Sequence, residues 1–209
     1  MEIGAHHPTS LSQTWLLEKN RWKGVLIEPL PHLADKLRKK RKNSIVFECA
    51  VSEPGKTGDA YILINEKDAL SEVIFEKPKT GKYKEIKVRT INEILSEAKC
   101  KYIDFLSIDI EGMEIPALTG FDFLKYKPKL IIIEDHCANL VKHRFLKEKG
   151  YKIVNRSGCN NWYIPKGLRY TGKRMVSRLE LIRKLYLELP FRIIRQNIKS
   201  KKSEPSCTS

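Results

Sequence analysis

Short runs of β-branched and aliphatic residues alternate, along the first 165 residues, with longer stretches whose apolar positions recur every three or four residues. The short runs predict strands and the longer stretches predict amphipathic helices. The order is βαβαβ, then an insertion, then βαβα and two final strands. The predicted strands cover residues 1–5, 24–28, 44–51, 60–65, 86–88, 103–110, 130–135, 152–155 and 161–164. The predicted helices cover residues 10–20, 32–42, 91–98, 114–119, 138–149 and 174–189.

Strands that alternate with helices favour a parallel sheet with helices on both faces. We therefore expect an α/β fold with a Rossmann-like, mostly parallel sheet and an antiparallel strand near one edge. The 209 residues, 41% of them hydrophobic, are enough for one domain with an appendage. We expect that domain over residues 1–165, a basic amphipathic helical appendage over 166–198 and a disordered tail over 199–209.

The net charge of +15 is concentrated at the C-terminal end. Residues 166–209 contain twelve Lys or Arg and three acids, which gives +9. Between residues 174 and 198 apolar positions recur near helical spacing among cations. This pattern is typical of a helix that lies on an anionic membrane, and equally of a helix docked on the domain with a solvated basic face.

No segment has the length or order of a transmembrane helix or a secretory signal. The five cysteines form no C-x-x-C pair, which favours reduced thiols. We therefore expect a cytoplasmic protein, with peripheral membrane contact through residues 174–198 as the alternative.

Candidate chemistry is concentrated where an apolar strand ends, in Y-I-D-F-L-S-I-D-I-E-G-M-E at residues 102–114. Three carboxylates, those of Asp109, Glu111 and Glu114, follow or flank a glycine there. The carboxyl ends of strands hold the ligand sites of open α/β sheets. This segment is therefore the first candidate for an active site.

Two further positions match a nucleoside-binding sheet. Gly4 follows the first predicted strand, and Glu28 ends the second, where an acid in Rossmann-like sheets binds the two ribose hydroxyls. His6 and Pro8 replace the later glycines of a G-x-G-x-x-G turn. A dinucleotide pyrophosphate site is therefore not expected.

Together these segments resemble the FkbM family of S-adenosylmethionine-dependent methyltransferases. The resemblance covers about residues 1–165, in the family's order and spacing. Family members normally have residues ahead of the first strand, so we expect the first strand here to be truncated. The matching segments are E-I-G-A-H at 2–6, W-K-G-V-L-I-E-P at 22–29, V-R-T-I-N-E-I-L at 88–95, I-D-F-L-S-I-D-I-E-G-M-E at 103–114 and A-L-T-G at 117–120.

The resemblance implies a class I methyltransferase sheet that binds S-adenosylmethionine. Gly4 and Ala5 would line the methionine part of the cofactor, Glu28 would bind the ribose, and Asp109 would close the pocket beside the sulfonium. The family is associated with methylating hydroxyl groups, so a glycan or small-molecule hydroxyl is the expected substrate. The implied cofactor-binding residues are Glu2, Gly4, Ala5, Glu28, Ala50, Val51 and Asp109.

A hydroxyl that accepts a methyl group must lose its proton, so a general base is useful. The candidates are Glu111, Asp109 and His136, which follows the next strand in E-D-H. The alternative is structural, because acids at a helix N-terminus are favoured by capping and by the helix dipole, and Glu111 and Glu114 would then only stabilise a helix.

A divalent metal such as magnesium is a further alternative, because oxygen ligands suit it. The residues come from two strand ends and nothing in the sequence fixes their spacing, so no metal is included in the predicted site. The possible ligands are Asp109, Glu111, Glu134, Asp135 and His136.

Two other functions fit the charge. An RNA methyltransferase would use the cations on phosphates. However, D-I-E-G after the fourth main strand differs from the Asn or Asp followed by Pro-Pro and an aromatic that methylation of base amino groups uses, so nucleic acid is not the expected partner. The non-enzymatic alternative is an inactive scaffold whose basic tail binds membranes or acidic partners.

Overall fold

The computed structural model describes residues 1–64, 72–135 and 140–171. These residues divide into two compact units, Met1–Ile133 and Glu134–Ser209. The predicted helix over 174–189, most of the predicted appendage and the predicted tail lie outside the described residues.

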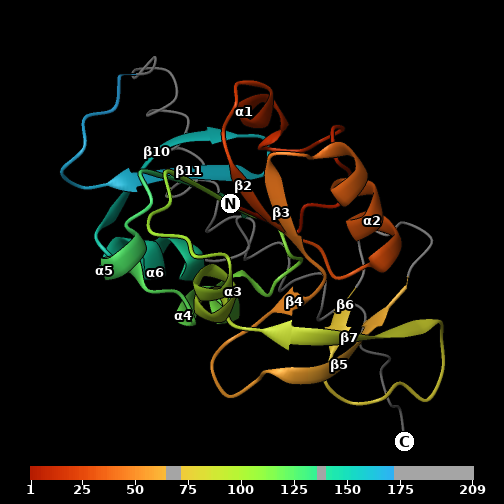
Figure 1. Cartoon of the computed structure of the whole chain (residues 1–209). Helices are drawn as coiled ribbons and strands as arrows, with labels where there is room; N and C mark the ends of the chain where they lie inside the picture. The colour runs from red at the N-terminus through yellow and green to blue at the C-terminus, as the bar shows by residue number, and fades with distance from the viewer. Residues whose placement is uncertain (65–71, 136–139, 172–209) are drawn as a thin grey trace, which may run out of the picture. The chain divides into compact units, whose positions relative to one another are not determined.

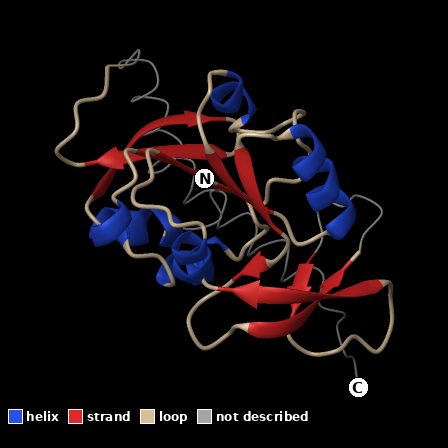
Figure 2. Cartoon of the chain, viewed as in Figure 1, coloured by secondary structure: helices blue, strands red, loops and turns tan. Residues whose placement is uncertain are grey.

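Five parallel strands form the main sheet of the first unit, in the order β9-β8-β1-β2-β3 (Figures 1 and 2). All four residues of β8 are buried, as expected for a central parallel strand. The two-residue β1 lies between β2 and β8. Strands that are far apart in the sequence are therefore neighbours in the sheet. The bounds are β1 Glu2–Ile3, β2 Gly24–Ile27, β3 Ser44–Phe47, β8 Phe105–Ile108 and β9 Leu130–Glu134.

Three helices of the first unit, α2, α3 and α4, lie where the apolar pattern predicted helices, whereas α5 was not predicted. On α2, Leu37 packs against Leu26 of β2, with Val46 of β3 beside them. The helix α3 begins with a capping box in which Thr90 and Glu93 satisfy each other's backbone N–H groups. The bounds are α1 Trp15–Lys19, α2 Pro31–Lys40, α3 Ile91–Glu97, α4 Glu114–Thr119 and α5 Phe123–Tyr126.

A second sheet of four strands, in the order β4-β7-β5-β6, lies beyond the start of α2 (Figure 1). Leu30 and Leu33, at the start of α2, belong to its apolar core. The predicted strand over 44–51 is wrong in one respect: it is two strands, because after Phe47 the chain leaves β2 and pairs with β7. The bounds are β4 Ala50–Val51, β5 Gly58–Leu63, β6 Glu72–Ile74 and β7 Tyr83–Arg89.

The second unit contains α6 (Val141–Glu148) and an antiparallel hairpin of β10 (Tyr151–Ser157) and β11 (Asn160–Pro165). Asp135 connects to the hairpin, because its carboxylate accepts a hydrogen bond of 2.8 Å from the Asn161 amide. In the described part of the chain, no helix is long and apolar enough to cross a membrane.

The predicted helix over 10–20 is shorter than expected and begins only at Trp15. The reason is the buried carboxylate of Glu2, which accepts the backbone N–H of Gln13 at 2.7 Å and the hydroxyl of Ser12 at 2.9 Å. These bonds hold the segment before Trp15 in a loop, since the Gln13 N–H donates to Glu2 and the N–H groups of Thr14 and Trp15 donate to the Ser12 hydroxyl.

A buried arginine connects this loop to the rest of the first unit. Arg41 directly follows α2 and is 1% exposed. Its guanidinium donates to Glu18 at 2.7 Å and to the Thr14 hydroxyl at 2.7 Å, and lies 3.8 Å from a Glu2 oxygen. A buried charge needs partners of this kind, because removing one leaves the others unpaired in a medium of low dielectric.

The same contacts determine the ionisation of Glu18. Burial alone would raise the pKa of Glu18, but hydrogen bonds from the Ser44 hydroxyl, the Asn43 N–H and Arg41 hold it below its ordinary value. A carboxylate with a lowered folded-state pKa stabilises the fold above its ordinary pKa of about 4.3, and this stabilisation is lost as the pH falls through the folded-state value.

We expect Arg41→Met to lower the free energy of unfolding at pH 7 by about 3–5 kcal/mol, because Glu2 and Glu18 would stay buried without their cation. The loss should shrink as the pH falls through the lowered folded-state pKa of Glu18, because a protonated Glu18 no longer pairs with Arg41. Urea unfolding measures both effects. Arg38→Met is the control, because Arg38 pairs with Asp35 and Glu48 at the surface and its loss should cost under about 1 kcal/mol. Equal costs for the two substitutions would contradict the assignment.

Candidate active site

Three of the predicted site residues follow neighbouring strands. Gly4 follows β1, Glu28 follows β2 and Asp109 follows β8. The three strands are parallel and hydrogen-bonded side by side. Their carboxyl ends therefore meet at one edge of the sheet, which is where open α/β sheets bind ligands.

The Gly4 turn is shaped by its neighbours on both sides. Gly4 has a φ of 78°, and a Cβ atom there would lie 1.9 Å from the carbonyl oxygen of Asp109. The N–H groups of Gly4 and Ala5 both donate to the carbonyl of Ile27, at 3.1 and 3.0 Å. Glycine is thus required by the close approach of β8, a reason that the sequence did not reveal. The Ala5 side chain points into the core, so only its backbone can face a ligand.

Glu28 connects the loops that follow β1 and β2. Its side chain is 4% exposed, and its two oxygens accept the N–H of His6 at 2.8 Å and the N–H of Leu30 at 2.9 Å. These bonds fix the plane of the carboxylate at the carboxyl edge. Glu28 therefore has a structural role in addition to its predicted contact with ribose.

The other predicted cofactor residues have different surroundings. The carboxylate of Glu2 faces Arg41 and the loop before α1. Ala50 and Val51 form β4, where they are buried and pair with Val88 and Arg89 of β7. Gly4, Ala5, Glu28 and Asp109 are the cofactor candidates that directly follow the adjacent strands β1, β2 and β8.

Glu114 stabilises the loop after β8. This side chain is fully buried, and one of its oxygens accepts the N–H of Gly112 at 3.1 Å and that of Ile110 at 3.4 Å. The structural interpretation therefore fits Glu114, which stabilises the loop that precedes its own helix. Glu111 lies at the top of this loop and is exposed.

Glu111 has a φ of 49°, in the left-handed region that disfavours residues other than glycine. Such a conformation costs on the order of 1 kcal/mol and tends to occur at functional sites. The Glu114 contacts explain how the conformation is maintained. The Glu111 carboxylate is therefore exposed beyond the edge of the sheet, where a substrate can contact it.

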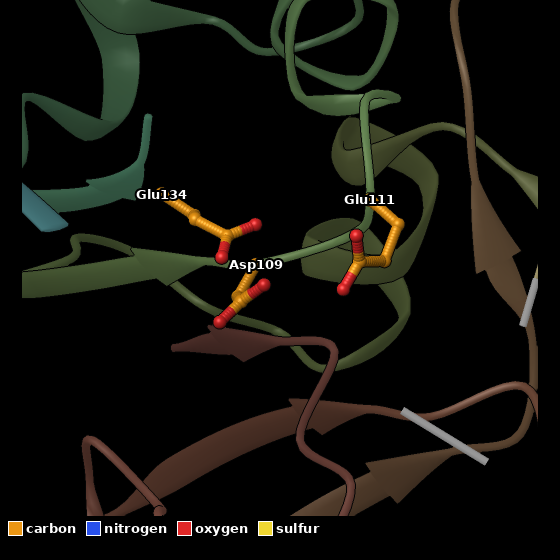
Figure 3. A group of neighbouring side chains, drawn as sticks. All are labelled: Asp109, Glu111 and Glu134. Atoms are coloured by element: carbon orange, nitrogen blue, oxygen red, sulfur yellow. The ribbon is translucent and has the colours of Figure 1, made fainter. Parts of the chain in front are cut away.

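Three carboxylate side chains lie close together at the end of β8. Side-chain oxygens of Asp109, Glu111 and Glu134, the last residue of β9, lie within 4.8 Å of one another (Figure 3). Asp135, another possible metal ligand, is bonded to Asn161 of the hairpin. His136 lies outside the described residues. Acidic groups of this kind are common without an ion, so no metal is assigned.

A parallel sheet with a glycine turn and two acids at its carboxyl edge is typical of α/β folds that bind nucleosides. The family model described as "Methyltransferase FkbM domain" matches residues 2–153, and the chain belongs to this family of methyltransferases. The resemblance predicted from the sequence is thereby confirmed. No curated protein and no solved structure matches the chain.

We expect Gly4→Ala to be more destabilising than Gly81→Ala by about 2 kcal/mol in urea unfolding. Both glycines have a positive φ, 78° and 92°, so the backbone strain of an alanine is similar. They differ in space, because the nearest atom to a Cβ at Gly81 is a Leu63 methyl group at 3.7 Å. If the two variants lost equal stability, the close approach of Asp109 would not be the constraint on Gly4.

Proposed function

We propose that this methyltransferase transfers the methyl group of S-adenosylmethionine to a hydroxyl group of a glycan or small molecule, at the carboxyl edge of the main sheet. The observation that carries the proposal is the common edge shared by the Gly4 turn, Glu28 and Asp109, with Glu111 held in a left-handed conformation beside them. FkbM-type methyltransferases generally use this cofactor.

The residues at the edge fit this cofactor by their chemistry. S-adenosylmethionine supplies a methyl group on a positively charged sulfonium. Glu28, whose plane is fixed by two backbone N–H groups, suits the hydroxyls of a ribose. Asp109 brings a negative charge to the neighbouring strand end, which suits a sulfonium. The backbone of Gly4 and Ala5 would line the space between them.

Glu111 is the proposed general base. The acceptor hydroxyl oxygen forms a bond to the methyl carbon as the carbon–sulfur bond breaks, and its proton goes to a carboxylate oxygen of Glu111. An exposed carboxylate in a fixed conformation is suited to this task, because proton transfer needs hydrogen-bond reach and alignment. Asp109 lies closer to the proposed cofactor and is assigned to binding.

Cofactor binding tests the first part of the proposal. Calorimetric titration with S-adenosylmethionine should show binding, and Glu28→Gln should weaken it by about tenfold, since the loss of one charged hydrogen bond costs about 1.5–3 kcal/mol. Glu48→Gln is the matched control, because Glu48 follows β3 as Glu28 follows β2 but lies at the surface beside Arg38. Unchanged affinity in a folded Glu28→Gln protein would leave Glu28 with its structural role alone.

Methyl transfer tests the second part. With labelled cofactor and a panel of oligosaccharides and RNA, we expect transfer to an oligosaccharide or another small hydroxyl compound. Glu111→Gln should lower kcat by about 10²–10⁴-fold while cofactor affinity stays within about twofold.

Glu114→Gln is the matched control, because its amide oxygen can still accept from Ile110 and Gly112 and the loop should stay in place. Transfer to RNA alone would overturn the proposed substrate. A Glu111→Gln enzyme of full activity would remove Glu111 from the reaction.

A further inference from the structure

A cavity of about 960 Å³ lies at the amino edge of the main sheet, at the opposite end from the candidate active site. Gly24, Ser44 and Phe105, the first residues of β2, β3 and β8, line it. Each of these strands is four residues long, so roughly 13 Å of strand separates the two edges. A ligand in the cavity would therefore not occupy the proposed cofactor site.

The walls of the cavity are strongly basic. Six cationic and two acidic side chains line it. The two acids are already paired, since Glu18 contacts Arg41 and Asp104 contacts Lys129, both at 2.7 Å. Four exposed cations remain, and within the described ranges no carboxylate pairs with them. They are Arg21, Lys23, Lys99 and Lys101.

Two exposed aromatic rings stand among these cations. Trp22 lies between Arg21 and Lys23 and is 44% exposed, and Tyr102 follows Lys101 and is 68% exposed. The two loops precede β2 and β8, the strands on either side of β1, so their ends lie about 10 Å apart. Aromatic rings between cations are one means by which proteins hold the base and the phosphate of a nucleotide.

Both loops hold their cations in the same rigid backbone motif. After α1 the N–H groups of Arg21 and Trp22 return to the carbonyls of Glu18 and Leu17, at 2.9 and 3.1 Å. After α3 those of Lys99 and Cys100 return to Ser96 and Leu95, at 3.0 and 2.9 Å. These are two Schellman motifs, whose left-handed position normally holds glycine.

Arg21 and Lys99 occupy those left-handed positions, with φ of 64° and 50°. A cation near a helix C-terminus is favoured by the dipole, which explains a charge in this turn. The helix dipole does not explain why the cation occupies the position with positive φ. A cation one residue earlier would interact with the dipole equally well, and glycine could then take the left-handed position. The repeated choice in two loops of one cavity points to a ligand.

We propose that this cavity binds a nucleotide, with the base against Trp22 or Tyr102 and phosphate groups on Arg21, Lys23, Lys99 and Lys101. Free nucleoside phosphates and the end of a single RNA strand share this chemistry. S-adenosylmethionine has no phosphate and lacks the charge that the cavity favours. The basic segment 166–209 is a poor occupant, because its charge of +9 has the same sign. The site is separate from the methyl acceptor, so RNA need not be the substrate.

The test uses the full chain at low salt, with ADP, UDP and a short single-stranded RNA as probes. Calorimetry and Trp fluorescence should show saturable binding that weakens as salt is added. The variant Arg21→Gly with Lys99→Gly removes two cations and relieves two strained positions. We expect nucleotide affinity to fall at least about tenfold while the unfolding midpoint is unchanged or raised.

Lys36→Ala with Lys39→Ala is the charge-matched control, because both lysines are exposed on α2 outside the cavity, and its affinity should stay within about twofold. Saturating S-adenosylmethionine should not displace UDP. Three results would overturn the proposal: no binding of any probe, binding that the glycine variant retains, or displacement by the cofactor. Binding of an anionic oligosaccharide with no nucleotide binding would also overturn it, since that would assign the cations to another ligand.

Discussion

The buried contact of Arg41 with Glu18, with Glu2 close by, connects the parts of the first unit on which both proposed sites depend. Arg41 comes from the end of α2, Glu18 from α1 and Glu2 from β1, so one guanidinium joins three elements that are distant in sequence. On one side, Glu2 begins the short strand that leads directly into the Gly4 turn. On the other side, Arg41 and Glu18 form part of the wall of the basic cavity. The two edges of the sheet are therefore supported by one buried group of charges.

The two edges differ in sign as well as in position. Carboxylates gather at the carboxyl ends of the strands, where Asp109, Glu111 and Glu134 lie close together, and exposed cations gather at the amino ends. The sheet thus carries opposite local potentials at its two ends, which suits a cationic sulfonium at one and a phosphate at the other. The residues that create these potentials are held by backbone contacts, through Glu114 at one edge and the Schellman motifs at the other.

Patterns of local sequence predicted most of the described strands and helices, though not β6 or α5, and they brought Gly4, Glu28 and Asp109 to one edge because parallel strands share their direction. What local patterns did not predict depends on contacts between distant residues. Glu2 was expected at the cofactor, yet its carboxylate shortens α1 through Gln13 and faces Arg41. The strand expected over 44–51 changes sheets after Phe47, a change that only the pairing of β4 with β7 determines. The left-handed φ of Glu111 likewise follows from a buried acid three residues later.

The change of sheet after Phe47 has a consequence for how this domain can be altered. Only Glu48 and Cys49 separate β3 from β4, and Cys49 is buried, so that burial raises the pKa of its thiol to about 12. The small sheet is therefore joined to the main sheet by a short crossing in which Cys49 is buried, and it shares the core under α2. It cannot be exchanged between proteins as an independent module, and any shift of its strands would be transmitted directly to the strand next to Glu28.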